Sequence, residues 1–170
     1  MIRCCRAVLI ALACLGCAEE PLAVEDNVEL ARFQGRWYEI AKLPRPLQAQ
    51  CTATTASYEL ASPSELLVKH ECREGGLDGP LRTVFARAVA SDPEVPAKLA
   101  LDFGFAFGDY WIIELDDSYQ YAVIGHPTRD YLWILSRTPA LDPELLAGII
   151  ERTRQKQFPV DLLNYTVQNP

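Results

Sequence analysis

The sequence has little basic charge and no long apolar run. Lys and Arg total 16 residues against 23 Asp and Glu, which gives a formal net charge of −7. Binding to a phosphate backbone needs a basic face, so the charge balance argues against a nucleic-acid partner. No apolar stretch reaches the ~20 residues that span a bilayer as a helix. The 170 residues, 49% hydrophobic and 23% charged, are instead typical of one globular domain.

Histidine is also scarce, and no motif for a catalytic or cofactor site is present. His70 and His126 are the only histidines. We find no Gly-x-Ser-x-Gly elbow, no paired metal ligands and no phosphate-binding glycine loop. An inward His70 could ligate haem or a metal, but an ordinary polar pocket group is the favoured interpretation. We therefore predict no enzyme, no metal site and no cofactor, with a nucleophilic cysteine as the catalytic alternative.

The first residues have the form of a secretory signal. Two arginines precede the apolar stretch Val8–Leu15, which is too short to span a membrane. The stretch ends at Gly16-Cys17 and is similar to a bacterial lipoprotein cleavage site, in which the cysteine is lipidated and becomes the first mature residue. This similarity predicts a signal peptide over residues 1–16, a lipidated Cys17 with a tether over 17–29, and a folded domain over 30–170.

Two alternatives to this N-terminus stay open. Cys14 could carry the lipid, or the chain could be secreted without an anchor after cleavage near Ala13. Residue 18 is Ala rather than Asp, which by the same resemblance favours the cell outer membrane of a Gram-negative bacterium. Loss of residues 1–16 takes the net charge to −9, because the two arginines leave. Attachment to an anionic membrane would then depend on the acyl chains.

Cys51 and Cys72 are the cysteines outside this N-terminal segment. An even pair in an exported protein predicts a disulfide. A metal site is the weaker alternative, because two cysteines and one histidine without a short Cys–Cys spacing make poor zinc geometry. A reactive thiol is the other alternative, and two free thiols would favour an enzyme.

From Gly35 to Arg137 the sequence consists of short apolar or alternating runs separated by Gly, Pro, Ser and Asp. Runs at this regular spacing are typical of strands joined by tight turns. The predicted strands are Arg36–Lys42, Thr52–Ala61, Glu65–Arg73, Arg82–Ser91, Ala97–Gly104, Tyr110–Asp116, Tyr119–Gly125 and Tyr131–Arg137. Eight strands with short connections indicate an all-β barrel or sandwich in one domain.

Strand alternation creates a conflict for the predicted disulfide. Cys72 shares a face with Val68, whereas Cys51 is out of phase with Ala56. A direct cross-strand bridge therefore requires a bulge, or requires Cys51 to lie in the loop before its strand.

One amphipathic helix follows the strands. Asp142 is a good N-cap, and Pro143 suits the first helical position. Apolar residues at helical spacing form one stripe, which we expect to pack outside the strands: Leu145, Leu146, Ile149 and Ile150. The helix should end before Pro159, and Leu162–Val167 is predicted as a short final strand.

Three motifs lie at the two ends of the strand region: Gly35-x-Trp37, Arg129-Asp130-Tyr131, and Arg137 within the run 130–139. In this order they resemble the lipocalin family, and the run 130–139 closely resembles the bacterial outer-membrane lipocalins and their animal relative apolipoprotein D. Arg129 departs from the Thr that is commonest in the family. The resemblance implies an eight-stranded up-and-down antiparallel β-barrel with a C-terminal α-helix packed outside.

We expect the motif residues Gly35, Trp37, Asp130, Tyr131 and Arg137 to be structural. Trp37 can fill the closed end of the barrel, and Arg137 can lie across its indole ring as a cation–π contact. The guanidinium can also donate to backbone carbonyls of incoming segments. Gly35 permits the close approach of the chain there.

The cavity lining follows by alternation, starting from an inward Arg137, and resemblance to relatives implies that Tyr110 and Ile112 also face inward. The residues predicted to line it are Ala56, Tyr58, Val68, Ala86, Leu101, Phe103, Tyr110, Ile112, Tyr131 and Trp133. An eight-stranded barrel can hold one small ligand, although the same side chains could also fill a solid core.

The resemblance implies a carrier of fatty acids or lysophospholipids that works in membrane maintenance. A lipocalin-fold enzyme, or a binder of haem or another hydrophobic ligand, is the alternative. A homodimer with a shared ligand mouth is a further possibility. Phe105 and Phe107 lie in a loop expected at the mouth, where they could contact a bilayer or plug the cavity.

Overall fold

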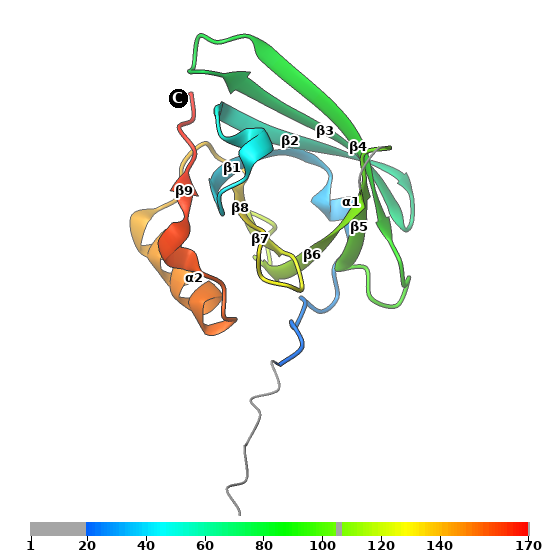
Figure 1. Cartoon of the computed structure of the whole chain (residues 1–170). Coiled ribbons are helices and arrows are strands. Elements are labelled where there is room, and N and C mark those ends of the chain that lie inside the picture. Colours follow the sequence, from blue (N-terminus) through cyan, green and yellow to red (C-terminus); the bar gives the residue numbers. More distant parts are fainter. Residues whose placement is uncertain (1–19, 105–106, 170) are drawn as a thin grey trace, which may run out of the picture.

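Antiparallel strands form one sheet that closes on itself (Figure 1). The computed structural model describes residues 20–104 and 107–169. Within these ranges the strands are β1 (Gly35–Lys42), β2 (Cys51–Ser62), β3 (Glu65–Glu74), β4 (Leu81–Ala90), β5 (Lys98–Asp102), β6 (Phe107–Leu115), β7 (Tyr121–Gly125), β8 (Leu132–Ser136) and β9 (Asn164–Tyr165). Each of β2 to β7 pairs with the next strand, and β1 pairs with β8, β2 and β9. The predicted eight-stranded up-and-down barrel is confirmed.

Several predicted boundaries were wrong. Strand β6 begins at Phe107, so residues 107–109 are not loop. The final strand is reduced to Asn164–Tyr165, because Val160–Leu162 forms a 3₁₀ turn, η2. The short helices α1 (Leu30–Phe33) and η1 (Pro46–Gln48) were not predicted. Helices this short have no periodic pattern of their own and depend on tertiary contacts.

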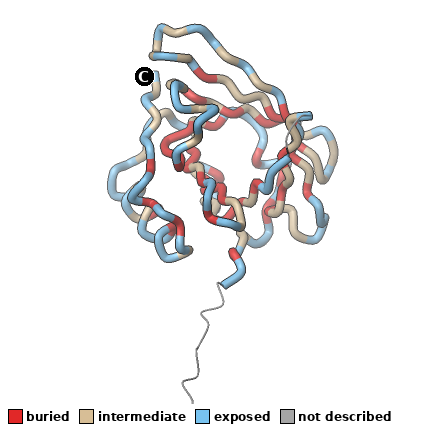
Figure 2. The backbone as a smooth tube through the Cα atoms, viewed as in Figure 1, coloured by how far each residue is buried: buried red, intermediate tan, exposed pale blue. Residues whose placement is uncertain are grey.

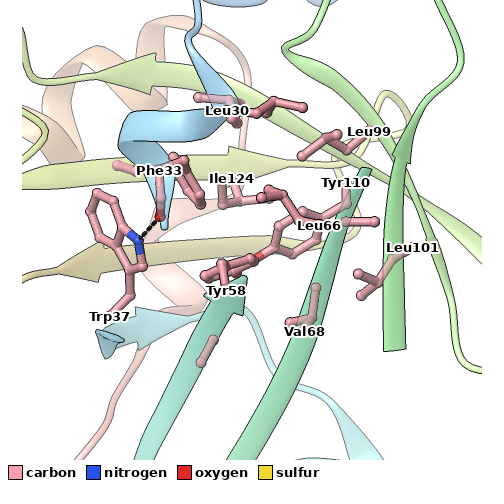
Figure 3. Close-up of a cluster of buried hydrophobic side chains, with 14 of the residues drawn as sticks. Leu30, Phe33, Trp37, Tyr58, Leu66, Val68, Leu99, Leu101, Tyr110 and Ile124 are labelled. Carbon is pink, nitrogen blue, oxygen red and sulfur yellow. Dashed lines mark hydrogen bonds between the residues drawn. The ribbon is translucent and has the colours of Figure 1, made fainter. Parts of the chain in front are cut away.

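Helix α1 and Trp37 fill one end of the barrel (Figure 3). Trp37 and Phe33 are fully buried, and their ring centroids lie 4.7 Å apart. The Trp37 indole Nε1 donates to the carbonyl of Phe33 at 2.8 Å. Because α1 supplies both an aromatic ring and a carbonyl, it closes the barrel at this end.

Arg137 covers Trp37 from outside. Its guanidinium carbon lies 3.8 Å from the centroid of the Trp37 indole. The guanidinium also donates to three backbone carbonyls, those of Arg32, Arg36 and Tyr119. Gly35 has φ +94°, and a Cβ there would lie 3.2 Å from Arg137 Nη1. One side chain thus ties α1, β1 and the β6–β7 turn together.

Helix α2 (Pro143–Gln155) packs on the outer face of the barrel (Figure 1). As predicted, the Asp142 side chain caps it by accepting from the amides of Glu144 and Leu145. Ile149 is buried against the barrel. Leu145, which we expected to be buried, is 37% exposed. The buried stripe is therefore narrower than the sequence predicts.

Figure 2 shows the buried residues along the strands in red, and on the strands beneath α2 they belong to two clusters, one in the barrel interior and one under the helix. On β6, Ile112 belongs to the interior cluster and Ile113 to the cluster beneath α2. On β8, Leu135 faces the interior and Ile134 faces α2. These strands are apolar on both faces because each face is covered.

The predicted disulfide between Cys51 and Cys72 is formed, with a Cα–Cα distance of 5.4 Å. The register of β2 against β3 shifts between Thr52 and Thr55. Ala53 lies in this bulge with φ 48°. The bulge brings the two cysteines into reach, which is one of the two solutions that the sequence required.

The predicted signal peptide, Cys17 and Phe105 lie outside the described residues. Part of the predicted tether packs on the barrel: Leu22 and Val28 are buried, and the Glu25 amide donates to the Ile112 carbonyl at 2.9 Å. Within residues 20–104 and 107–169, no helix has both the length and the apolar character needed to cross a membrane.

We expect R137A to lower the free energy of unfolding by about 2–3 kcal/mol, because it removes a cation–π contact and three hydrogen bonds. Urea unfolding followed by far-UV circular dichroism measures this loss. R36A is the matched control, since the Arg36 side chain is exposed on β1 and its backbone carbonyl, which R36A keeps, accepts from Arg137. Equal losses in the two variants would contradict a closing role for Arg137.

Candidate functional site

A cavity of about 280 Å³ opens at the end of the barrel opposite Trp37. We call it the mouth cavity. Its apolar wall comes from β4, β5, β6 and β8 and consists of Val84, Leu101, Phe103, Tyr110, Tyr131 and Trp133. Other lining residues come from η1, β2 and β3 and include Gln48, Thr54, His70 and the Cys51–Cys72 disulfide, and the charged residues Arg45, Glu71, Arg82 and Asp109 also line the cavity. The lining therefore combines an apolar wall with polar and charged side chains.

The predicted cavity residues divide between several places. Leu101, Phe103, Tyr110, Tyr131 and Trp133 line the mouth cavity. Ala56 and Ile112 do not line it and are packed in the buried interior cluster. That any of these residues contacts a ligand stays a prediction.

The other three predicted residues, Tyr58, Val68 and Ala86, border a different depression of about 620 Å³. Leu67 and Phe85 also border this depression, and Phe85 is 70% exposed. Both have the outward parity of their strands, opposite to Val68 and Ala86. Because outward side chains supply much of its lining, we take the smaller mouth cavity as the candidate site.

Two buried tyrosines, Tyr58 and Tyr110, meet inside the barrel (Figure 3). The hydroxyls of Tyr58 and Tyr110 lie 2.6 Å apart and satisfy each other. Burial raises the pKa of both phenols. Both phenols therefore stay uncharged at neutral pH.

Arg45 places a cation beside the apolar wall. Its guanidinium carbon lies 4.1 Å from the ring centroid of Tyr131 and 5.3 Å from that of Trp133. Arg45 is half-buried, and desolvation lowers its pKa. No carboxylate of the described residues forms an ion pair with it. An incompletely hydrated cation without an anionic partner is suited to an anionic ligand group.

His70 of β3 also lines the cavity. Its Nε2 is buried and has no hydrogen-bond partner among the described residues. Burial lowers the pKa of His70 to about 4, because desolvation penalises the imidazolium. His70 is therefore neutral at pH 7. No group of three or more His, Cys, Asp or Glu side chains that could hold a metal ion occurs in the described part of the chain.

The rim carries aromatic and charged residues. Phe107 lines the cavity and is 77% exposed at the start of β6. Arg129 is buried, and its guanidinium donates to the carbonyls of Lys156, Pro127 and Glu20. Arg129 therefore joins the β7–β8 loop to the end of α2 and to the N-terminal segment.

Sequence reasoning missed several lining residues. Thr54 has the same parity as Ala56 and Tyr58, and Val84 the same parity as Ala86, so alternation could have identified both. Arg45 and Gln48 lie in the irregular segment between β1 and β2, where no periodicity indicates a side-chain direction.

A family model described as "Lipocalin-like domain" matches residues 28–168. The chain belongs to the lipocalin family. Lipocalins bind small hydrophobic ligands and are generally carriers rather than enzymes. The match covers every strand of the barrel and helix α2, and it agrees with the resemblance that the three sequence motifs predict.

Relatives of this lipocalin come from plants, bacteria and animals. "Temperature-induced lipocalin-1" of Arabidopsis thaliana is 32% identical and covers 89% of this chain and 85% of its own length. "Outer membrane lipoprotein Blc" of Escherichia coli K12 is 31% identical, with 88% and 84% covered. "Apolipoprotein D" of Rattus norvegicus is 33% identical, with 72% and 68% covered. The predicted similarity to bacterial outer-membrane lipocalins and to apolipoprotein D is confirmed.

A solved structure shows the same fold. Lobster apocrustacyanin A1 superposes with a TM-score of 0.67 at 18% identity and covers 82% of this chain and 79% of its own. At this identity the likeness concerns the fold of the lipocalin barrel alone.

We expect the stability of this lipocalin to fall as the pH drops from about 6.5 to about 4. The unfolded chain binds a proton on His70 near its ordinary pKa of 6.5, whereas the folded chain does so only near pH 4. The loss is at most about 3 kcal/mol. Urea unfolding at pH 7 and pH 4 measures it, and H70F should remove that part of the loss. Parallel pH profiles for H70F and the wild type would contradict the neutral, buried His70.

Proposed function

We propose that this lipocalin carries a single-chain lipid, either a fatty acid or a lysophospholipid, in the mouth cavity. We further propose that acylated Cys17 holds it at the cell outer membrane, where it stores or transports lipids for membrane maintenance. The observation that carries the proposal is Arg45, a half-buried cation lying over Tyr131 and Trp133 at an otherwise apolar cavity wall.

An amphiphile with one acyl chain matches these features. Its chain would lie against Leu101, Phe103 and Trp133, and each buried CH₂ contributes about 0.8 kcal/mol. Its carboxylate or phosphate would lie near Arg45. The volume of about 280 Å³ is at the lower limit of ligand pockets, which measure about 300–1,000 Å³. This size favours one chain over two.

The position of the N-terminal segment supports a role at a membrane. The Glu20 carbonyl accepts from Arg129 Nη2 at 2.7 Å, beside the β7–β8 loop. That loop contributes His126 to the mouth cavity. Cys17 precedes Glu20 by three residues, a span of at most about 10 Å. A lipid on Cys17 would therefore enter the membrane close to the open end of the barrel.

The alternatives have less support. The cysteine nucleophile of an enzyme would need a free thiol, and Cys51 and Cys72 form a disulfide. Haem ligation by His70 has the buried Nε2 in its favour, and an absorbance titration tests it below. The predicted homodimer with a shared mouth stays a prediction, and an end point of one ligand per two chains would support it.

We expect palmitate and a palmitoyl lysophospholipid to change the tryptophan emission of a chain beginning at Ala18, which contains every described residue. The change should saturate at micromolar ligand, below micelle formation. W133F should lose most of it, because Trp133 lines the cavity. W111F should keep it, because Trp111 packs in the cluster beneath α2. No response to either lipid, or an undiminished response in W133F, would overturn the proposal.

We expect R45M to weaken palmitate binding about tenfold, because it removes the charge and keeps an apolar side chain of similar length. Binding of uncharged monopalmitoylglycerol should change less than twofold. K98M is the matched control, since Lys98 lies over Trp111 at 4.8 Å, away from the cavity. Equal weakening of both lipids by R45M would indicate a packing role for Arg45 rather than recognition of charge.

A further inference from the structure

Three polar side chains of the mouth cavity lack partners. Gln48 Oε1, Thr54 Oγ1 and His70 Nε2 are buried and make no hydrogen bond within the described part of the chain. These are all of the buried, unpartnered side-chain oxygens and nitrogens found there, and all three residues line the mouth cavity. Unpartnered polar atoms that gather in one cavity indicate an interaction with a ligand.

The bulge in β2 and its contacts with the C-terminal tail fix the position of Thr54. The bulge of β2 places it next to Ala53, whose amide donates to the Val167 carbonyl at 2.7 Å. The side-chain amide of Gln168 donates to the Thr54 carbonyl at 2.9 Å. The C-terminal tail thus satisfies the backbone of the bulge, while the Thr54 hydroxyl is buried without a partner at the cavity.

His70 and Gln48 are the other two residues of this group. His70 pairs with Ala56 of β2 and Val84 of β4, and its ring centroid lies 6.2 Å from that of Phe103. Gln48 is the last residue of η1, and it lines the mouth cavity together with Leu47 of the same turn. The three side chains come from separate elements, so their gathering is a property of the tertiary structure.

The chemistry of the set matches an uncharged oxygen group. A threonine hydroxyl donates and accepts, a neutral imidazole Nε2 does one or the other according to its tautomer, and an amide oxygen accepts. An alcohol can both donate and accept, whereas a carboxylate only accepts. The cation that suits a carboxylate, Arg45, lies over Tyr131 and Trp133 of the apolar wall.

We propose that Gln48, Thr54 and His70 form a subsite for an alcohol on the bound lipid, so that the cavity prefers an acyl ligand carrying a hydroxyl. The inference rests on the proposed function. The hydroxyl could come from a hydroxylated acyl chain or from the glycerol of a monoacyl ester. A ligand hydroxyl placed among these groups would supply the hydrogen bonds that the described residues do not give them.

The test compares dissociation constants for palmitate, for hydroxypalmitates with the hydroxyl at different positions, and for monopalmitoylglycerol against methyl palmitate. At least one hydroxylated member should bind about fivefold more tightly than its plain counterpart, equivalent to about 1 kcal/mol. Preference within the fatty acids assigns the subsite to a chain hydroxyl. Preference only for the glycerol ester assigns it to the headgroup.

T54V and H70F should reduce this preference to less than twofold. T55V is the matched control and should keep it, since Thr55 is the next residue on β2 and does not line the cavity. T54V should also raise the urea midpoint of the empty protein, because a methyl group replaces an unpartnered hydroxyl of the same shape. A lowered midpoint would show that the hydroxyl is already satisfied and would overturn the proposal.

Two further outcomes separate the hypotheses. Equal binding of plain and hydroxylated lipids would overturn the subsite and leave the carrier function standing, whereas no binding of any of these lipids would overturn the carrier function itself. Haem is the second probe. A Soret band that shifts on binding and is lost in H70F, without any hydroxyl preference, would assign Nε2 to iron and overturn the subsite.

Discussion

Closure of the barrel by Arg137 and Trp37 is the constraint on which the rest of the structure depends. The guanidinium lies 3.8 Å from the indole centroid and donates to three carbonyls, so it joins α1, β1 and the β6–β7 turn. Because α1 and Trp37 fill this end, the mouth cavity opens at the other. The side chains suited to binding a ligand accordingly lie around the mouth cavity.

Buried polar side chains of the barrel fall into two groups, one hydrogen-bonded within the protein and one without a partner among the described residues. Tyr58 and Tyr110 are deeply buried and satisfy each other through a 2.6 Å contact. At the mouth, Thr54 Oγ1 and His70 Nε2 have no hydrogen-bond partner in the described residues. The Arg45 guanidinium lies beside aromatic rings and forms no ion pair with a carboxylate of the described residues. The tyrosine pair is thus satisfied within the protein. The unpartnered groups lie in the mouth cavity, where a ligand can enter and form the missing hydrogen bonds.

Much of the barrel and part of the candidate site could be predicted from the sequence. Alternation correctly placed Leu101 of β5 and Trp133 of β8 at the interior, because β5 pairs with β6 and β7 with β8 without a register shift, whereas Tyr110 of β6 was placed by resemblance to relatives. The same rule covers Thr54 and was not applied to it. No rule covers Arg45, because the segment between β1 and β2 is irregular, and its side chain is directed by contacts with residues far along the chain.

Features that depend on neighbours along the chain could be derived from the amino-acid sequence: strand alternation, turn residues, and the capped helix after Asp142. The sequence also required a bulge or a loop at Cys51, since parity excludes a direct bridge. Only the tertiary structure decided the rest. The C-terminal tail binds the bulge at Ala53, and separate elements bring Gln48 and His70 to one cavity. These contacts join distant residues, and short-range patterns carry no information about them.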